Sequence, residues 1–292
     1  MSVDERVPLA RYTTIGTGGP ARFFAKPETL EELHASLRWA EEEGVPVETI
    51  GLGSNLLVHD DGVEALVLKL AGELATAHVE GDLLVAGGGA TNAVCLHRAR
   101  AAGLGGFEFA SAIPGTAGGG VRMNAGAYGR EWRTVLVDAV VVDAQGPRTL
   151  TLDELDLDYR HSGLKAGEVV AQVRFRLEQS TPEAVKARAA ELLAQRKATQ
   201  PTNKRTFGSV FKNPEGDRGA GSLIEECGLK GHRIGGALIS PRHANFIENA
   251  DGASSADCIA LMIEARRRVR ESFGIELRHE VQFLGPLALP DL

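Results

Sequence analysis

Four glycine-rich turns are predicted along the chain, and three of them carry polar side chains beside their glycines, a pattern that can bind an anionic group. Glycine has no Cβ, so backbone N–H groups can approach a ligand closely, and successive donors form a nest for a diphosphate without positive side chains. One such segment alone is more often a tight turn, but four favour a nucleotide site. The segments are GLGSN (51–55), GGG (87–89), PGTAGGG (114–120) and NAGAYG (124–129), with Ser54, Asn55, Thr116 and Asn124 supplying polar atoms.

Common nucleotide motifs are absent from the sequence. No G-x-G-x-x-G follows a predicted strand and opens a helix, and the nearest match, GTGGPA at Gly16, contains Pro20 and follows no convincing strand. Walker A, H-E-x-x-H and G-x-S-x-G motifs are also missing. The nucleotide is therefore expected on a scaffold other than a Rossmann or P-loop fold.

Composition narrows the class of protein further. The length of 292 residues fits two or three compact domains, and glycine, at 35 residues, is well above its usual share. A net charge of −7 argues against a general nucleic-acid binder. Three widely spaced cysteines, Cys95, Cys227 and Cys258, indicate neither a zinc site nor a disulfide framework. No signal peptide or apolar run of about 20 residues is visible, so we expect a cytoplasmic protein without a membrane insertion.

Strands and helices alternate through the first half of the chain. Thr29 and Glu32 predict a capping box for a helix that ends at Gly44, followed by a strand from Val45. A hairpin is expected around Glu80–Asp82, and Thr91 is expected to cap a short helix ending at Gly103.

The second half begins with strand patterns and ends in a helical domain. Val135–Ala144 is β-branched, and apolar residues alternate from Val169 to Leu177, which predicts two strands. A break at 180–182 opens a helix from Pro182 to about Lys197. A further helix is predicted from Ala256 to Phe273, with Arg266–Arg268 on its solvated face, and a last strand at 279–285. The fold class is α+β in several domains, with one domain boundary predicted at the break at 180–182.

Five motifs, in order along the chain, resemble one family, the UDP-N-acetylenolpyruvoylglucosamine reductases (MurB). The resemblance runs from about Tyr12 to Gly285, and two of its motifs are long and specific. The motifs are GLGSNLLV (51–58), IPGTAGGGVRMNAGAYG (113–129), DYRHS (158–162), GSVFKNP (208–214) and HEVQFLG (279–285). The chain lacks an inserted tyrosine-bearing loop after Tyr159, which is typical of the shorter subtype.

The resemblance implies a fold and an activity. The fold would be an FAD-binding fold of the vanillyl-alcohol-oxidase (PCMH) type in two subdomains, 1–70 and 71–179. A C-terminal α+β substrate-binding domain, 180–292, would return its last strand and tail to the flavin site. The activity would be NADPH-dependent reduction of UDP-N-acetylglucosamine enolpyruvate to UDP-N-acetylmuramate, in peptidoglycan precursor synthesis. Ser54 and Asn55 stand where relatives with covalent flavin often carry histidine, so noncovalent FAD is expected.

The resemblance also assigns residues to the site. Arg160, Ser209 and Glu280 would be catalytic. Substrate would meet Tyr159, Lys212, Asn213, Arg242 and His243, with Lys204 and Arg205 as further candidates for its diphosphate. FAD would be bound by Gly51, Leu52, Gly53, Ser54, Asn55, Leu56, Pro114, Gly115, Thr116, Gly118, Gly119, Asn124, Gly126 and Ala127. No metal is expected.

Elementary chemistry supports the three catalytic roles. Adding hydride to an enol ether that bears a carboxylate builds negative charge on that carboxylate, and the planar guanidinium of Arg160 can stabilise it. The carbon must then be protonated, and the Ser209 hydroxyl can act as general acid. Glu280 can face the same carboxylate only if one of the two is protonated.

Two departures from the family pattern and two alternatives stay open. The loop before Ser209 reads NKRTF, and Arg278–His279 precede Glu280 where a proline often stands. His161 and His279 are expected to be structural or exposed rather than catalytic. The alternatives are another FAD-dependent oxidase on the same scaffold and a noncatalytic nucleotide-binding module. The oligomeric state is open, a monomer being one option.

Overall fold

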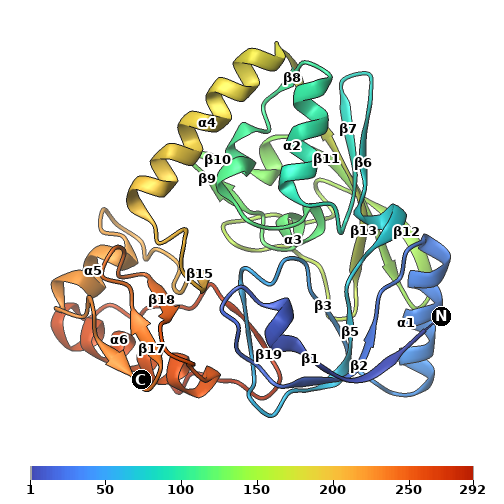
Figure 1. Ribbon diagram of the computed structural model, residues 1–292. Helices are drawn as coiled ribbons and strands as arrows, with labels where there is room; N and C mark the ends of the chain where they lie inside the picture. Colours follow the sequence, from blue (N-terminus) through green and yellow to red (C-terminus); the bar gives the residue numbers. More distant parts are fainter. Residues whose placement is uncertain (1, 292) are drawn as a thin grey trace. The chain divides into compact units, whose positions relative to one another are not determined.

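The computed structural model describes residues 2–291, which form two compact units, each drawn from separate stretches of the chain (Figure 1). Unit 1 comprises Phe23–Leu52, Ala65–Arg196 and the N-terminal residues up to Glu5. Unit 2 comprises Arg6–Arg22, Gly53–Glu64 and the chain from Lys197 onward. The three-domain division at residues 70 and 179 stays a prediction, because compactness alone gives two discontinuous units.

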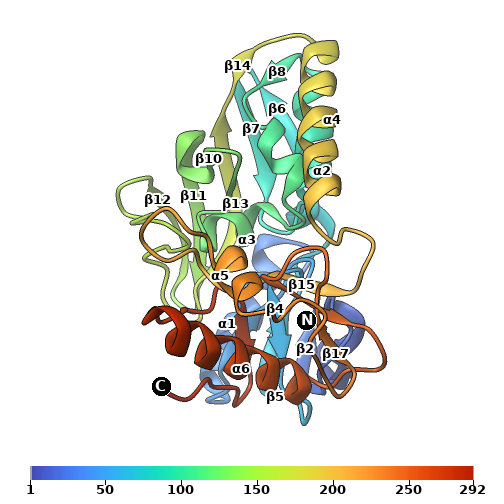
Figure 2. The same cartoon turned by 90° about the vertical axis from the view of Figure 1, so that its left-hand side faces the viewer.

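An antiparallel five-stranded sheet organises unit 1. Its order is β12 (Gly146–Thr151), β11 (Leu136–Asp143), β13 (Val169–Arg176), β7 (Leu83–Gly87) and β6 (Ala77–Glu80). Figure 2 shows helix α2 (Asn92–Ala101) beside β6 and β7. Four aromatic rings pack together in the core of this unit, mostly edge to face and with centroids 5.0–6.1 Å apart: Phe107, Phe109, Trp132 and Phe175.

A second sheet has the order β1 (Asp4–Pro8), β2 (Pro20–Ala25), β5 (Val63–Leu68) and β3 (Val47–Thr49). Helix α1 (Leu30–Glu42) buries Leu33, Leu37 and Ala40 in the core cluster that contains Leu66 and Leu68 of β5. Helix α4 (Pro182–Thr199) buries Val185 and Leu192. The short elements of the first 180 residues are η1 (Leu9–Tyr12), η2 (Gly72–Ala75), β8 (Leu104–Gly105), η3 (Glu108–Ala112), α3 (Ala117–Arg122), β9 (Gly126–Ala127), β10 (Arg130–Glu131), η4 (Trp132–Thr134) and β14 (Glu178–Gln179).

Unit 2 is built around a four-stranded sheet and one long helix. The sheet order is β15 (Thr206–Ser209), β18 (Phe246–Asn249), β17 (Ala237–Ile239) and β16 (Arg233–Ile234), with α5 (Ala220–Glu226) and α6 (Ser255–Phe273) as its helices. Strand β4 (Leu56–Val58) pairs in parallel with β19 (Gln282–Leu284). Asp60 accepts the N–H groups of Ser255 (2.8 Å) and Ala256 (2.9 Å), so an early segment caps the start of a late helix.

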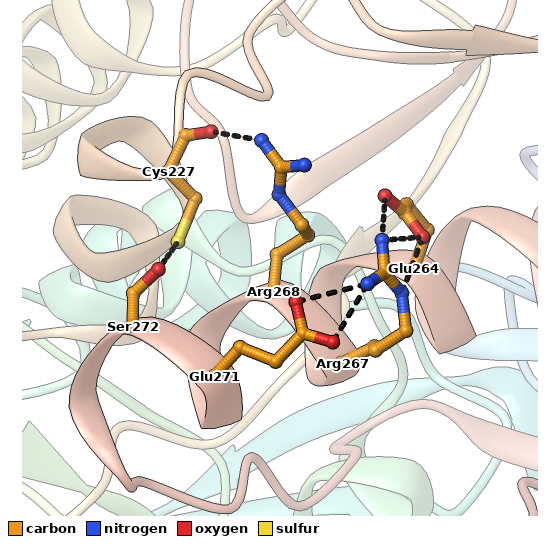
Figure 3. A network of polar contacts seen from close by, with 6 residues as sticks. All are labelled: Cys227, Glu264, Arg267, Arg268, Glu271 and Ser272. Atoms are coloured by element: carbon orange, nitrogen blue, oxygen red, sulfur yellow. Dashed lines mark hydrogen bonds and ion pairs between the residues drawn. The ribbon is translucent and has the colours of Figure 1, made fainter.

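The arginine run on α6 was predicted to lie on a solvated face, and one of its three residues does not. Arg267 is exposed and pairs with Glu264 and Glu271, and Arg268 donates to the carbonyl of Cys227 (Figure 3). Arg266, in contrast, is buried and donates to the carbonyls of Leu277 (3.1 Å) and Pro290 (2.7 Å). The prediction for Arg266 is therefore wrong, because its position on the helix faces the chain that follows α6.

Several local predictions are confirmed. Thr91 caps α2 through a bond from the Val94 N–H, and Glu80–Leu83 form the hairpin ends of β6 and β7. The alternating segment forms β13, and the two long helices occur within two residues of their predicted ends. The capping box at Thr29 is only half present: Thr29 accepts the N–H of Glu32, but the Glu32 carboxylate accepts the N–H of Glu28.

Candidate active site

Three of the four glycine clusters converge within unit 1. A Cβ on Gly51 would lie 2.7 Å from Oγ1 of Thr116, so the first and third clusters touch. The N–H of Gly118 donates to the carbonyl of Gly88 (2.8 Å), which joins the third cluster to the second. Segments far apart in the sequence thus form one glycine-lined cradle.

The third cluster is not a turn throughout, as its glycine content suggested. Thr116 is the N-cap of helix α3, its Oγ1 accepts the N–H of Gly119 (3.3 Å), and Gly118–Gly120 lie inside the helix. The turn prediction is therefore wrong for residues 117–120. The change suits an anion, because the N-terminal end of a helix carries partial positive charge.

The fold itself requires glycine at only some positions of the cradle. A Cβ on Gly88 would lie 1.8 Å from the carbonyl oxygen of Val170, and one on Gly87 would lie 2.3 Å from that of Leu74. These glycines serve the packing of the protein itself. A Cβ on Gly115 would meet only Nδ2 of Asn92 at 3.5 Å, and one on Gly119 only Oγ1 of Thr116 at 3.4 Å. Neither has a positive φ, so the fold itself does not require glycine there.

A lysine that the sequence analysis did not select lies at the cradle. Lys69 directly follows β5, and its Nζ donates to the carbonyl oxygen of Gly51 at 2.6 Å. In a trans peptide the C=O and the next N–H point in opposite directions, so this bond directs the N–H of Leu52 away from Lys69. The signal in the sequence is a single lysine in the otherwise apolar run LVLKL.

Just before the cradle, β3 carries a half-buried carboxyl group, Glu48. Burial raises the pKa of Glu48, and the charge of Arg122 opposes that rise.

The fourth cluster, NAGAYG, is a hairpin between β9 and β10. Tyr128 (φ 54°) and Gly129 (φ 77°) are its two central residues, as in a type I′ turn. Asn124 is fully buried, and its amide donates to Glu131 (3.1 Å) and to the Asp158 carbonyl (3.1 Å) while accepting the N–H of Arg133 (3.0 Å). Its side chain therefore organises the surrounding loops.

Arg160 lies at a tight turn next to this hairpin. Asp158 and His161 bond to each other across the turn, and Arg160 has a φ of 53°, which is unusual for a residue other than glycine. Its Nη2 donates to the carbonyl of Gly126 (3.1 Å), and its guanidinium lies 5.0 Å from the ring centre of Tyr159. The predicted catalytic arginine and the predicted flavin-side loop are thus in direct contact.

Exposed apolar side chains in unit 1 concentrate in the same motifs. In residues 2–291, four large hydrophobic side chains are exposed, and three of them are Leu52, Tyr128 and Tyr159, at 39–43%. Each belongs to a segment of the resemblance. Exposed aliphatic and aromatic side chains are suited to cover a planar ligand.

Ser209 lies in unit 2, at the end of β15. The pairing of β15 with β18 shifts register between Thr206 and Ser209, where Gly208 has a φ of 81°. A Cβ on Gly208 would lie 3.0 Å from the Ser54 carbonyl oxygen. The second half of the first glycine segment, from Gly53 onward, therefore meets the loop that carries Ser209.

Glu280 is held beside the same loop by backbone pairing. Its N–H donates to the carbonyl of Val210 (2.8 Å), and the N–H of Lys212 donates to the carbonyl of Arg278 (2.9 Å). Glu280 itself is not in a strand: the predicted strand over 279–285 is wrong at its ends, since β19 covers only Gln282–Leu284. Ser209 and Glu280 are brought together in unit 2, and Arg160 belongs to unit 1.

The substrate candidates in unit 2 have mixed surroundings. Oδ1 of Asn213 accepts the N–H of Ala220 (3.1 Å) at the start of α5, and Arg242 donates to the carbonyls of Lys197 (2.7 Å) and Ala198 (2.9 Å). Nδ1 of His243 accepts the N–H of Asn245 (3.2 Å), and burial followed by the charge of Lys230 lowers the pKa of His243. A neutral imidazole adds no positive charge for a diphosphate.

The remaining predicted residues lie in the following places. Pro114 is exposed just before Gly115, Leu56 begins β4 and pairs with Gln282, and Ala127 pairs with Arg130 in the hairpin. A Cβ on Gly53 would lie 2.0 Å from the Tyr12 carbonyl oxygen, so this glycine serves local packing. Lys204 donates its N–H to Pro201, and Arg205 lies near Gly16 in unit 2.

The two histidines beside catalytic candidates have different surroundings. His161 is exposed. The ring of His279 stacks on Phe283 at 4.5 Å with a 10° interplanar angle, and its Nδ1 lies 2.8 Å from the Val281 carbonyl oxygen. His279 therefore has a structural role in fixing the chain around Glu280.

In the part of the chain that the structure describes, no helix has the length and apolar character to cross a bilayer.

Comparison with known proteins identifies the family of the chain. Residues 200–284 match the family model "UDP-N-acetylenolpyruvoylglucosamine reductase, C-terminal domain", and residues 21–151 match "FAD binding domain". Reductase 2 of this name from Symbiobacterium thermophilum is 43% identical over 95% of this chain and 91% of its own length. The Novosphingobium aromaticivorans reductase is also 43% identical, over 95% of this chain and 94% of its own length.

A solved structure extends the similarity to the fold. The crystal structure of UDP-N-acetylenolpyruvylglucosamine reductase (MurB) from Thermus caldophilus has a TM-score of 0.85 and 38% identity, covering 97% of this chain and 99% of that one. The α+β flavoprotein fold is thereby confirmed. On sequence and on structure, over nearly its full length, the chain belongs to the UDP-N-acetylenolpyruvoylglucosamine reductase family.

Proposed function

We propose that the protein uses FAD and NADPH to reduce UDP-N-acetylglucosamine enolpyruvate to UDP-N-acetylmuramate, in peptidoglycan precursor synthesis. The observation that carries the proposal is the family match over residues 200–284, which includes both Ser209 and Glu280. We place the protein in the cytoplasm. Its three cysteines, Cys95, Cys227 and Cys258, are free, as is usual for proteins in that reducing compartment.

The cradle of unit 1 fits FAD. Gly115 and Gly119 leave space that the fold itself does not need, and the adjoining N-terminus of α3 and Lys69 suit a diphosphate. Leu52, Tyr128 and Tyr159 offer apolar surface for a planar ring. When bound, FAD supplies the hydride chemistry and is reduced by NADPH. Asn124 orders the loops of the site through its buried amide.

Arg160 would bind the carboxylate on which negative charge develops. Its guanidinium is oriented by the Gly126 carbonyl and the Tyr159 ring, so little reorganisation is required when charge appears. The strained backbone at Arg160 is consistent with a site residue held in place by its surroundings.

Ser209 would donate a proton to the substrate carbon, and Glu280 would face the reacting carboxylate in its protonated form. Their loops are joined through the bond from Glu280 to Val210, so their separation is set by backbone pairing rather than by flexible side chains. Lys212, which pairs with Arg278 in the same ladder, is a candidate for binding the UDP-sugar.

An anaerobic two-step titration tests the function. NADPH should bleach the flavin, and adding the enolpyruvyl UDP-sugar should restore its colour. The flavin of an oxidase with the same fold would be reduced by that enzyme's own substrate and reoxidised by oxygen, and the enolpyruvyl UDP-sugar would not reoxidise it. A protein that takes up no FAD would instead indicate a noncatalytic nucleotide-binding module.

The Ser209→Ala variant tests the assignment of the proton donor. Bleaching by NADPH should survive, while reoxidation by the enolpyruvyl substrate should slow by about 10²–10⁴-fold, the usual contribution of a general acid. Stopped-flow absorbance of the flavin separates the two steps. Equal slowing of both would assign Ser209 a structural role.

A further inference from the structure

The peptide carbonyl of Glu280 accepts hydrogen bonds from two side-chain amides. Nε2 of Gln282 lies 3.0 Å from this oxygen, and Nδ2 of Asn55 lies 3.3 Å from it. A second bond joins Asn55 to the chain two residues further on, because the backbone carbonyl of Asn55 accepts the N–H of Gln282 at 3.0 Å. Asn55 thus bonds to both ends of the short segment 280–282.

The N–H of Glu280, which belongs to the preceding peptide group, is also fixed. The Glu280 N–H donates to Val210, which directly follows Ser209, and His279 holds the Val281 carbonyl while stacking on Phe283. Glu280 lies outside any strand, between an isolated bridge at His279 and the start of β19. Because no regular ladder fixes this residue on both sides, the amides supply the bonds that a strand would otherwise provide.

We propose that Asn55 and Gln282 are positioning residues, which together fix the Glu280 peptide beside Ser209. The inference rests on the proposed function, since it concerns the residue that faces the reacting carboxylate. Asn55 also belongs to the first glycine segment, where sequence comparison alone placed it among the FAD-binding residues. Its side-chain amide is directed at the Glu280 carbonyl.

The shared acceptor has a measurable consequence. When one donor is removed, the other still holds the carbonyl, so each single substitution has a small effect. When both are removed, the Glu280 carbonyl loses both of these side-chain bonds, and the position of Glu280 relaxes. The two effects on rate should therefore be non-additive, which is the signature of residues that act on one group.

The experiment uses the FAD-loaded full-length protein and three variants: Asn55→Ala, Gln282→Met and the double variant. The matched control is Gln145→Met, which removes an exposed glutamine amide that donates to Glu41 at 2.9 Å in unit 1. Anaerobic stopped-flow records bleaching by NADPH and reoxidation by the enolpyruvyl UDP-sugar separately. The flavin absorption spectrum and the Kd for FAD are measured for each variant.

Each single variant should slow reoxidation by about threefold. The double variant should slow it by about 50-fold or more, because Glu280 is then misplaced relative to the substrate. Bleaching, the flavin spectrum and the control should stay within about twofold of the wild type. If the Asn55 variants bind FAD too weakly, Gln282→Glu serves instead, because its carboxylate repels the Glu280 carbonyl and should slow reoxidation about tenfold.

Three results would overturn the inference. The first is a double variant whose slowing of reoxidation equals the product of the two single-variant factors. The others are equal slowing of both half-reactions, or a Gln282→Glu variant that matches the wild type. Its failure is distinguishable from failure of the proposed function. If wild-type flavin is reoxidised by the substrate and the double variant is as fast, only the positioning roles are wrong. If the wild type itself is not reoxidised, the function is wrong.

Discussion

Gly88 and Gly119 lie in adjoining segments of the unit 1 cradle, yet their surroundings are opposite. At Gly88 an added Cβ would collide with the Val170 backbone, whereas Gly119 is exposed and an added Cβ would make one ordinary contact. Both occur in runs of three glycines, so the sequence does not distinguish them. A glycine that the fold does not need is the better marker of space kept for a ligand.

The largest effect is expected from Gly88→Ala. A Cβ 1.8 Å from a carbonyl oxygen forces a backbone shift between the GGG segment and β13, at a cost of about 4 kcal/mol or more. Thermal unfolding without FAD should show a fall in Tm of about 10 °C or a failure to fold. A Tm within about 2 °C of the wild type would remove the distinction between the two kinds of glycine.

Gly119→Leu should affect the ligand and spare the fold. Leucine favours a helix over glycine by about 0.5–1 kcal/mol, so the FAD-free protein should be as stable as the wild type or slightly more. The side chain would occupy the space assigned to FAD, and the Kd for FAD should rise about 100-fold or more. Flavin fluorescence measures the affinity. Unchanged FAD binding would place the ligand elsewhere.

Substitution of Lys69 should weaken FAD binding more moderately. Lys69→Met removes both the charge and the bond to Gly51, Lys69→Gln removes the charge alone, and Lys69→Arg keeps both. The Kd for FAD should rise about 10- to 30-fold in the Lys69→Met variant, because a hydrogen bond from a charged group is lost. It should rise less in the Lys69→Gln and Lys69→Arg variants. ADP, which carries the adenosine and diphosphate of FAD but not its riboflavin part, should show the same order by calorimetry. Lys186→Met, on an exposed turn of α4, is the control.

The smallest effect concerns pH and His243. Burial holds the pKa of His243 below its ordinary value of 6.5, so the unfolded chain binds a proton at mildly acidic pH that the folded protein does not. Stability should then be full above pH 6.5 and should fall as pH drops below it. Urea unfolding of wild type and His243→Gln should show a smaller acid-side loss in the variant. A steeper loss in the variant would contradict the cause given for the pKa.

Local patterns predicted local structure well. The cap at Thr91, the hairpin after Glu80 and the alternating strand ending at Arg176 depend on neighbours within a few residues. The helical state of residues 117–120 was missed because glycine disfavours helices, and here close packing of Gly120 against Trp132 outweighs that preference.

Long-range arrangement was predicted only through the resemblance. The motif order pointed to Ser209 and Glu280 as one group, and the ladder through Val210 agrees with their proximity. The roles of Lys69 and Gln282 depend on contacts between segments distant in sequence or on a side chain turned back to its own backbone. Residue type and spacing carry little information about such contacts.

The cap that Asp60 places on α6 has a consequence for how the chain folds during synthesis. Unit 2 takes its strand β4 and this cap from residues made early, but their partners lie in the last third of the chain. Contacts of such long sequence separation slow folding, and an emerging chain must wait for them. Unit 2 therefore cannot assemble until β19 has left the ribosome, and Leu57, a core residue of that unit, stays without its partners for most of translation.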